Sequence, residues 1–214
     1  MDIKTAKKIV CEAGLNLSQK GLVPRTWGNI SQRIDENRFV ITPSGRNYND
    51  ITPDDIVLMD IHDLSYEGSV KPSSEKRLHA EVLRNRKDVN AVIHTHQTHA
   101  STVAAAKCVI PVTDREVQNK IGTSINCTPN AIPGSKKLAR LIAMALDNNN
   151  AALIANHGTF CAGENMDDAF EVAILLEKIC LKFIEDSFLD HTGRHAPFDI
   201  KEMHEYYLTH YSKR

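Results

Sequence analysis

The chain has 214 residues, of which 42% are hydrophobic and 25% are charged, and 26 Lys and Arg against 27 Asp and Glu give a net charge of −1. This balance argues against nucleic-acid binding and against an anionic membrane surface, which both attract basic proteins. No apolar stretch reaches the roughly 20 residues that span a bilayer, and the first residues do not resemble a signal peptide. We therefore predict a cytoplasmic protein with one domain over residues 1–214.

Apolar positions at helical spacing predict a first helix over residues 2–18, which Gly21 ends. Two short β-prone segments, 29–33 and 39–42, flank the turn signal Asp35-Glu36-Asn37 and predict a hairpin. A capped helical turn is expected at 52–55 and a helix opening at 72–75. Further strands are expected at 56–60, 90–96, 124–128 and 151–156, and further helices at 98–106, 135–146 and 165–185.

This irregular alternation of strands and helices favours one α/β domain with a largely antiparallel central sheet flanked by helices.

The tail from His191 is polar and contains three tyrosines. The five cysteines are odd in number and form no Cys-x-x-Cys pair, so we expect neither a disulfide framework nor a zinc–thiolate site.

Three histidines lie at the ends of two expected strands. His94 and His96 are two residues apart, so their side chains share one face of a strand, about 6.6 Å apart, and can converge on a metal ion. His157 follows the buried strand at 151–156 and precedes Gly158. Three histidines leave an open coordination position, as in catalytic zinc sites. The alternative is that these are polar strand-end residues and that His157 is a turn residue.

Glu75 is the carboxylate expected near these histidines. An acidic residue in the first turn of a helix commonly serves only the helix dipole. However, Ser73 and Ser74 precede it, and hydroxyls beside free backbone N–H groups at a helix N-terminus suit a phosphate. Two more small-residue turns, Gly28-Asn29 and Ser44-Gly45, offer further donors. Together the three segments are typical of an anion pocket.

Five segments resemble the class II aldolase/adducin family in residues, order and spacing, and the resemblance runs from about Ala6 to the C-terminal tail. They are Gly28-Asn29-Ile30-Ser31, Ile41-Thr42-Pro43-Ser44-Gly45, Pro72-Ser73-Ser74-Glu75, Ala91-Val92-Ile93-His94-Thr95-His96 and Asn156-His157-Gly158.

The resemblance implies an enzyme that cleaves a ketose 1-phosphate to dihydroxyacetone phosphate and a short aldehyde. It implies that Glu75 is the acid/base and that one Zn²⁺ per subunit is held by His94, His96 and His157. It also implies that the substrate phosphate is bound by Gly28, Asn29, Ser44, Gly45, Ser73 and Ser74.

The resemblance further implies a homotetramer with active sites between subunits, where Tyr211 matches a tyrosine of the family's C-terminal tail. Arg115 stands where the aldolases of this family have a second catalytic tyrosine. An arginine can stabilise an alkoxide or hold an anion, but it is a poor proton donor because its pKa exceeds about 12. This departure bears on the choice of substrate more than on the aldol chemistry.

Three alternatives remain within this resemblance. A pentulose-phosphate 4-epimerase of the same superfamily carries aspartate where Glu75 stands, and is therefore less favoured. A methylthioribulose-phosphate dehydratase uses the same metal site to remove water. A non-catalytic, adducin-like module need not keep the metal-binding residues, all of which are present here.

Overall fold

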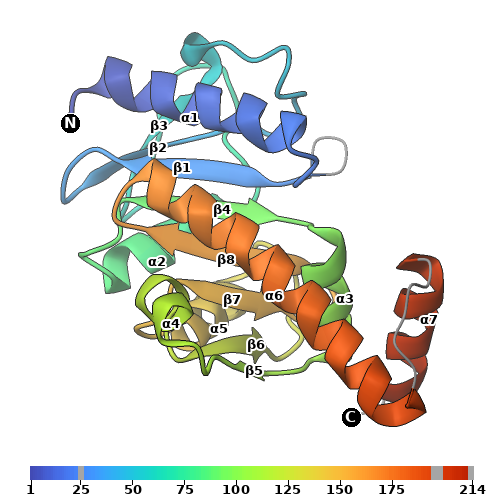
Figure 1. The fold of residues 1–214 in the computed structure, drawn as a ribbon. Coiled ribbons are helices and arrows are strands. Elements are labelled where there is room, and N and C mark those ends of the chain that lie inside the picture. The colour runs from blue at the N-terminus through green and yellow to red at the C-terminus, as the bar shows by residue number, and fades with distance from the viewer. Residues whose placement is uncertain (24–26, 194–199, 212–214) are drawn as a thin grey trace.

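The computed structural model describes residues 1–23, 27–193 and 200–211. In this part of the chain, eight strands form one central sheet with helices packed on both faces (Figure 1). The strands are β1 (Asn29–Arg33), β2 (Arg38–Ile41), β3 (Val57–Asp60), β4 (Ala91–Thr95), β5 (Ile110–Pro111), β6 (Ser124–Thr128), β7 (Ala151–Ile154) and β8 (Gly158–Gly163).

The sheet has the order β3-β2-β1-β4-β8-β7-β6-β5, and every pair of neighbours is antiparallel except β6 and β7. The expected α/β fold with a largely antiparallel sheet is therefore confirmed. The early hairpin also forms, because β1 and β2 pair directly with Ser31 opposite Ile41. Strands β1, β4 and β8 occupy the middle of the sheet, where apolar side chains cover both faces.

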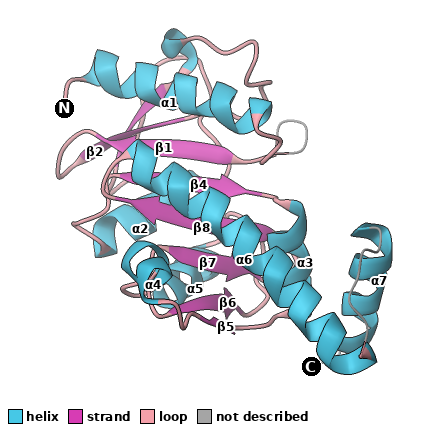
Figure 2. Ribbon diagram, in the orientation of Figure 1, coloured by secondary structure: helices cyan, strands magenta, loops and turns pink. Residues whose placement is uncertain are grey.

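Two helical layers enclose the sheet (Figure 2). Helices α1 (Ile3–Gln19), α3 (Thr98–Ala106) and α6 (Met166–Thr192) contribute to the apolar core on one face. Helices α2 (Lys76–Asn85) and α5 (Lys136–Leu146) pack on the opposite face and against each other. The remaining helical elements are η1 (Pro53–Asp55), α4 (Arg115–Ile121) and α7 (Ile200–Tyr211).

Several elements differ from the sequence prediction. The expected strand at 151–156 ends at Ile154, because Asn156 takes a positive φ of 57° in the turn that leads into β8. Neither β8 nor the short elements β5 and α4 were predicted, and the polar tail contains α7, which lies beside α3. The long helix continues past residue 185 to Thr192, where Gly193 with a φ of 66° ends it.

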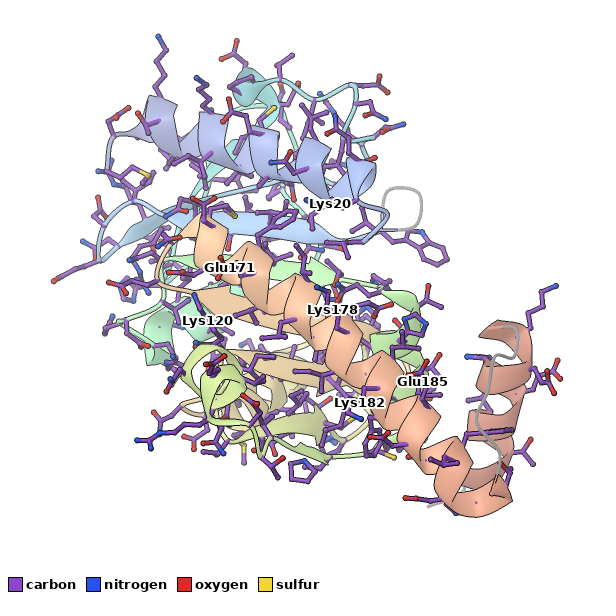
Figure 3. All side chains as sticks on the ribbon, viewed as in Figure 1. Lys20, Lys120, Glu171, Lys178, Lys182 and Glu185 are labelled. Carbon is purple, nitrogen blue, oxygen red and sulfur yellow. The ribbon has the colours of Figure 1, made fainter. Side chains whose placement is uncertain are left out.

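On its side that faces away from the sheet, α6 carries the exposed residues Glu171, Lys178, Lys182 and Glu185 (Figure 3). Lys120 of α4 forms an ion pair with Glu171 (2.8 Å), whereas Leu176 and Cys180 on the inner side are fully buried. Although α6 has 27 residues, these charges interrupt its apolar character. Among the described residues, no helix is long and apolar enough to cross a membrane.

Candidate metal centre and anion cleft

Strand pairing brings the predicted histidines to one end of the sheet. Within β4, His94 is paired with Asn29 of β1 on one side and with Phe160 of β8 on the other. His96 follows the end of this strand. His157 lies in the tight turn between β7 and β8, immediately before the residue that begins β8. The three side chains therefore come from the end of β4 and from the turn that leads into β8, the strand that pairs with β4.

The imidazole rings are close enough to share one ion. Their candidate ligand nitrogens all lie within 4.8 Å of one another, and Nε2 of His94 is 3.0 Å from Nε2 of His96. His94 is fully buried, and its Nδ1 lies 2.6 Å from the carbonyl oxygen of Thr159. A carbonyl only accepts, so Nδ1 carries a hydrogen, and Nε2, which faces the other histidines, is the nitrogen that could bind a metal.

The carboxylate of Glu75 completes the cluster. Its Oε2 lies 3.1 Å from Nε2 of His94, and its Oε1 lies 3.4 Å from Nε2 of His157. Oε1 is buried and has no hydrogen-bond partner among the described residues. Carboxylate oxygens and imidazole nitrogens thus converge within ion-pair distance of one another. This arrangement fits a divalent cation of the kind that three imidazoles bind.

Burial sets the protonation of these groups. It lowers the pKa of His96 to about 3, with help from the neighbouring His94 and His157, and it also lowers the pKa of His157. Neutral imidazole is the form that ligates a metal. For Glu75, burial raises the pKa, but the adjacent His94 and the hydrogen bond from Asn29 outweigh this effect and lower it. The carboxylate is therefore ionised.

Two glycines allow the backbone to approach these ligands. A Cβ on Gly28, which has a φ of 129°, would lie 2.8 Å from the carbonyl oxygen of His94. A Cβ on Gly158 would lie 2.4 Å from the carbonyl oxygen of Thr95 and 3.2 Å from the His94 ring. All three distances are shorter than ordinary van der Waals contact, so side chains here would displace the strand ends that position the histidines.

A cleft of about 710 Å³ opens beside the histidines. Two loops form one wall, because the backbone N–H of Ser73 donates to Thr42 (3.0 Å) and that of Ser44 donates to Lys71 (2.9 Å). The cleft is lined by Trp27, Gly28, Asn29, Pro43, Ser44, Gly45, Ser73, Ser74, Glu75, His96, Pro133, Gly134, Asn156 and His157.

The lining contains each residue that the sequence predicted for the phosphate. Helix α2 begins at Lys76, later than expected, and no serine side chain caps it. Instead, Oγ of Ser73 accepts a hydrogen bond from the backbone N–H of Glu75 (3.2 Å). Ser73 is buried, whereas Ser74 and Ser44 are exposed to the cleft. The backbone N–H groups of Ser44, Ser73 and Glu75 are paired within this wall. The exposed Ser44 and Ser74 are therefore the small polar residues that could bind an anion here.

Two predicted site residues do not join this cluster within the chain. Arg115 is exposed at the start of α4 and does not line the cleft. The side chain of Tyr211 lies outside the described residues.

The structure adds two residues that the sequence analysis missed. His79 of α2 is fully buried, with its ring nitrogens hydrogen-bonded to Asn29 and Ser31. Its signal in the sequence is a spacing of four residues from Glu75, which places both on one side of a helix start. Trp27 is 52% exposed at the cleft, and its ring centroid lies 5.8 Å from that of His96.

Fold, histidine cluster and cleft together define an α/β protein with a candidate metal centre beside a cleft lined by small polar residues. Comparison with known families identifies which class this is: residues 8–183 match the family described as Class II Aldolase and Adducin N-terminal domain. The chain belongs to this family.

Individual relatives agree with this assignment. The chain is 33% identical to L-fuculose phosphate aldolase of Escherichia coli strain K12, over 85% of its own length and 83% of the relative. It is also 33% identical to 5-deoxy-D-ribulose 1-phosphate aldolase of Bacillus thuringiensis, over 83% of each chain. A solved structure of L-fuculose 1-phosphate aldolase superposes with a TM-score of 0.80 at 29% identity, covering 95% of this chain and 96% of that chain.

Proposed function

We propose that this chain is a metal-dependent aldolase that cleaves the C3–C4 bond of a ketose 1-phosphate, giving dihydroxyacetone phosphate and a short aldehyde. The observation that supports it most directly is the contact of Glu75 with two of three clustered histidines, at a cleft lined by small polar residues. Aldol cleavage needs these three functions together: an electrophile, a mobile proton and a group that holds the phosphate.

His94, His96 and His157 hold the metal in this proposal, and their number and type favour Zn²⁺, one per subunit. When bound, a divalent ion supplies Lewis acidity that stabilises the negative charge developing on the C2 oxygen of the substrate. Gly28, Asn29, Ser44, Gly45, Ser73 and Ser74 bind the phosphate. Because this contact is remote from the reacting bond, its binding energy orients C2 and C3 toward Glu75.

Glu75 moves the proton at C3. As the C3–C4 bond breaks, its electron pair stays with C3 and is delocalised onto the C2 carbonyl as an enediolate, while the C4 hydroxyl loses its proton and becomes the aldehyde. The Glu75 carboxylate takes up a proton from solvent and delivers it to C3, while the proton from the C4 hydroxyl passes to its own base and then to solvent. One proton leaves the C4 oxygen and one reaches C3, so the reaction needs no oxidant or reductant.

In this proposal, the group that takes the proton from the C4 hydroxyl is Tyr211, in the C-terminal tail of a neighbouring subunit. The protein is then a homotetramer whose active sites lie between subunits. Arg115 does not line the cleft of its own chain, so it reaches substrate only across such an interface. Light scattering of the purified protein tests the tetramer, and Tyr211→Phe should then lower kcat.

A cleavage assay with defined substrates tests the function. Purified protein is incubated with L-fuculose 1-phosphate or 5-deoxy-D-ribulose 1-phosphate, the substrates named for two relatives. Released dihydroxyacetone phosphate is measured with a coupled NADH-dependent reductase. The aldehyde identifies the substrate, because the first sugar gives lactaldehyde and the second gives acetaldehyde.

The alternatives give different results in the same assay. A pentulose-phosphate 4-epimerase inverts C4 without releasing dihydroxyacetone phosphate, and a methylthioribulose-phosphate dehydratase releases water instead. A non-catalytic module turns over none of these sugars and has no need of bound metal. Absence of dihydroxyacetone phosphate with every ketose 1-phosphate, from protein that contains its metal, would refute the aldolase.

A further inference from the structure

The structure contains a buried chain of hydrogen bonds that ends on Glu75. Nε2 of His79 is hydrogen-bonded to Oδ1 of Asn29, and Nδ1 of His79 lies 2.7 Å from Oγ of Ser31. Asn29 in turn donates from Nδ2 to Oε2 of Glu75 (2.9 Å). Ser31 and His79 are fully buried and Asn29 is nearly so, so water does not compete for these bonds.

The chemistry of the side-chain groups fixes which atoms donate and which accept in this series of hydrogen bonds. An amide oxygen only accepts, so Nε2 of His79 carries the hydrogen that Asn29 receives. Burial lowers the pKa of His79 to about 3, which keeps the ring neutral, and its Nδ1 then accepts from the hydroxyl of Ser31. The phenyl ring of Phe160 packs edge-on against the imidazole, with ring centroids 5.0 Å apart, and limits its rotation.

The orientation of the Asn29 amide follows from these roles. With Oδ1 held by His79, the amide presents its N–H to Glu75. The reverse orientation would place the amide oxygen against a carboxylate oxygen and the amide nitrogen against the N–H of His79. Both contacts are repulsive, and in a buried site each leaves polar groups unpaired.

We infer that His79 is a positioning residue for proton transfer: with Ser31 it locks the Asn29 amide, which holds Oε2 of Glu75 and leaves Oε1 to exchange the proton with C3. This inference rests on the proposed function and names a residue that touches neither metal nor substrate. It agrees with the absence of any hydrogen-bond partner for Oε1 among the described residues.

Hydrogen exchange isolates the step in question. Enzyme with its metal is incubated with dihydroxyacetone phosphate alone in D₂O. Glu75 removes one proton from the hydroxymethyl carbon, whose electron pair is delocalised as the enediolate. The carboxyl then exchanges its proton for a deuteron and returns it. One carbon-bound hydrogen is replaced by deuterium, without an aldehyde, and NMR follows the loss of signal.

Two substitutions of His79 separate its hydrogen bond from its bulk. His79→Leu replaces the imidazole with an apolar side chain of similar reach and so removes the hydrogen-bond donor. This variant should lower both the exchange rate and kcat about 10- to 100-fold and should retain its metal. His79→Gln keeps an N–H directed at Asn29 and should recover most of this loss. If His79→Leu exchanges deuterium at the wild-type rate, the inference is wrong.

A double-mutant cycle distinguishes positioning from a general structural defect. In the Asn29→Ala background the link to Glu75 is already broken, so adding His79→Leu should change exchange by no more than about twofold. If His79→Leu lowers the exchange rate by the same factor in both backgrounds, the inference is overturned. If His79→Leu does not fold, Ser31→Ala takes its place in the same cycle. Wild-type protein that neither exchanges nor cleaves would overturn the proposed function, and the inference with it.

Discussion

Oε2 of Glu75 lies 3.1 Å from Nε2 of His94, whose other nitrogen already donates its hydrogen to the carbonyl of Thr159. Nε2 of His94 is therefore the nitrogen that faces the carboxylate, and either a proton on it or a metal ion beside it stabilises this buried contact. The same carboxylate also receives the N–H of Asn29 (2.9 Å). In the proposed function, metal binding and proton transfer share these neighbouring atoms but depend on different side chains, and substitutions should separate the two.

The first prediction concerns the metal. Purified protein should contain about one divalent ion per chain, and His96→Ala should lose most of it because two imidazoles bind zinc far less tightly than three. Elemental analysis by mass spectrometry measures both. His62→Ala, at an exposed position outside the cleft, is the control. Full metal content in His96→Ala would contradict the site.

Glu75→Gln should lower kcat by roughly 10²- to 10⁴-fold, the usual contribution of a positioned acid–base group. The amide keeps the shape and some hydrogen bonding but has no transferable proton. Metal content and inhibition by inorganic phosphate should change little. Turnover at the wild-type rate would mean that Glu75 only complements the start of α2, and that the proton comes from another group.

Ser74 and Ser73 should respond differently to alanine. Ser74 is exposed to the cleft, so Ser74→Ala should mainly raise KM, by about 10- to 100-fold for a lost hydrogen bond to a charged phosphate. Ser73 also accepts from the backbone N–H of Glu75, so Ser73→Ala should lower kcat as well. Steady-state kinetics with inorganic phosphate as competitor tests both. A phosphate that fails to compete would contradict the anion cleft.

Acid should destabilise the folded chain through His79. Burial lowers the pKa of this ring from 6.5 to about 3, so between these values the unfolded chain binds a proton that the folded chain excludes. Stability therefore falls as pH falls, and His79 alone contributes about 1.6 kcal/mol of the loss from pH 6.5 to pH 5. The pKa of His96 is lowered in the same way and adds its own loss, so urea unfolding of metal-free protein at these two pH values is compared between the wild type and a His79 variant. Over the same pH interval, the stability loss of the His79→Leu variant should be smaller than that of the wild type by about the His79 contribution. The same pH dependence in both proteins would contradict the prediction.

A carboxylate from α6 caps the start of α3. The carboxylate of Glu177 accepts the backbone N–H groups of His99 and Ala100 (both 2.9 Å) at the start of α3, directly after the strand that carries the histidines. Glu177→Ala should cost about 1–2 kcal/mol of unfolding free energy. Glu171→Ala, which removes an exposed ion pair on the same helix, should cost less than about 1 kcal/mol. Equal losses in thermal unfolding would show that the cap contributes nothing specific.

The sequence determined most of the local features. Helix α1, the hairpin of β1 and β2, and strand β4 follow from apolar periodicity and turn residues, which are local properties. The alternation of side chains along a strand likewise predicts that His94 and His96 point to the same face. The resemblance of five short segments to one family identified most of the cleft residues from Gly28 to His157, but not Trp27, Pro133 or Gly134.

Only the tertiary structure decided how these segments meet. Nothing local indicates that β8 turns back at Asn156 to pair with β4, or that Asn29 lies opposite His94. The role of His79 likewise depends on strand β1 placing Asn29 and Ser31 within reach of α2, although these residues are 50 and 48 positions away in the chain. Hydrogen bonds between such distant residues form because burial of the apolar faces brings the strands and helices together, and only then are the buried polar groups matched.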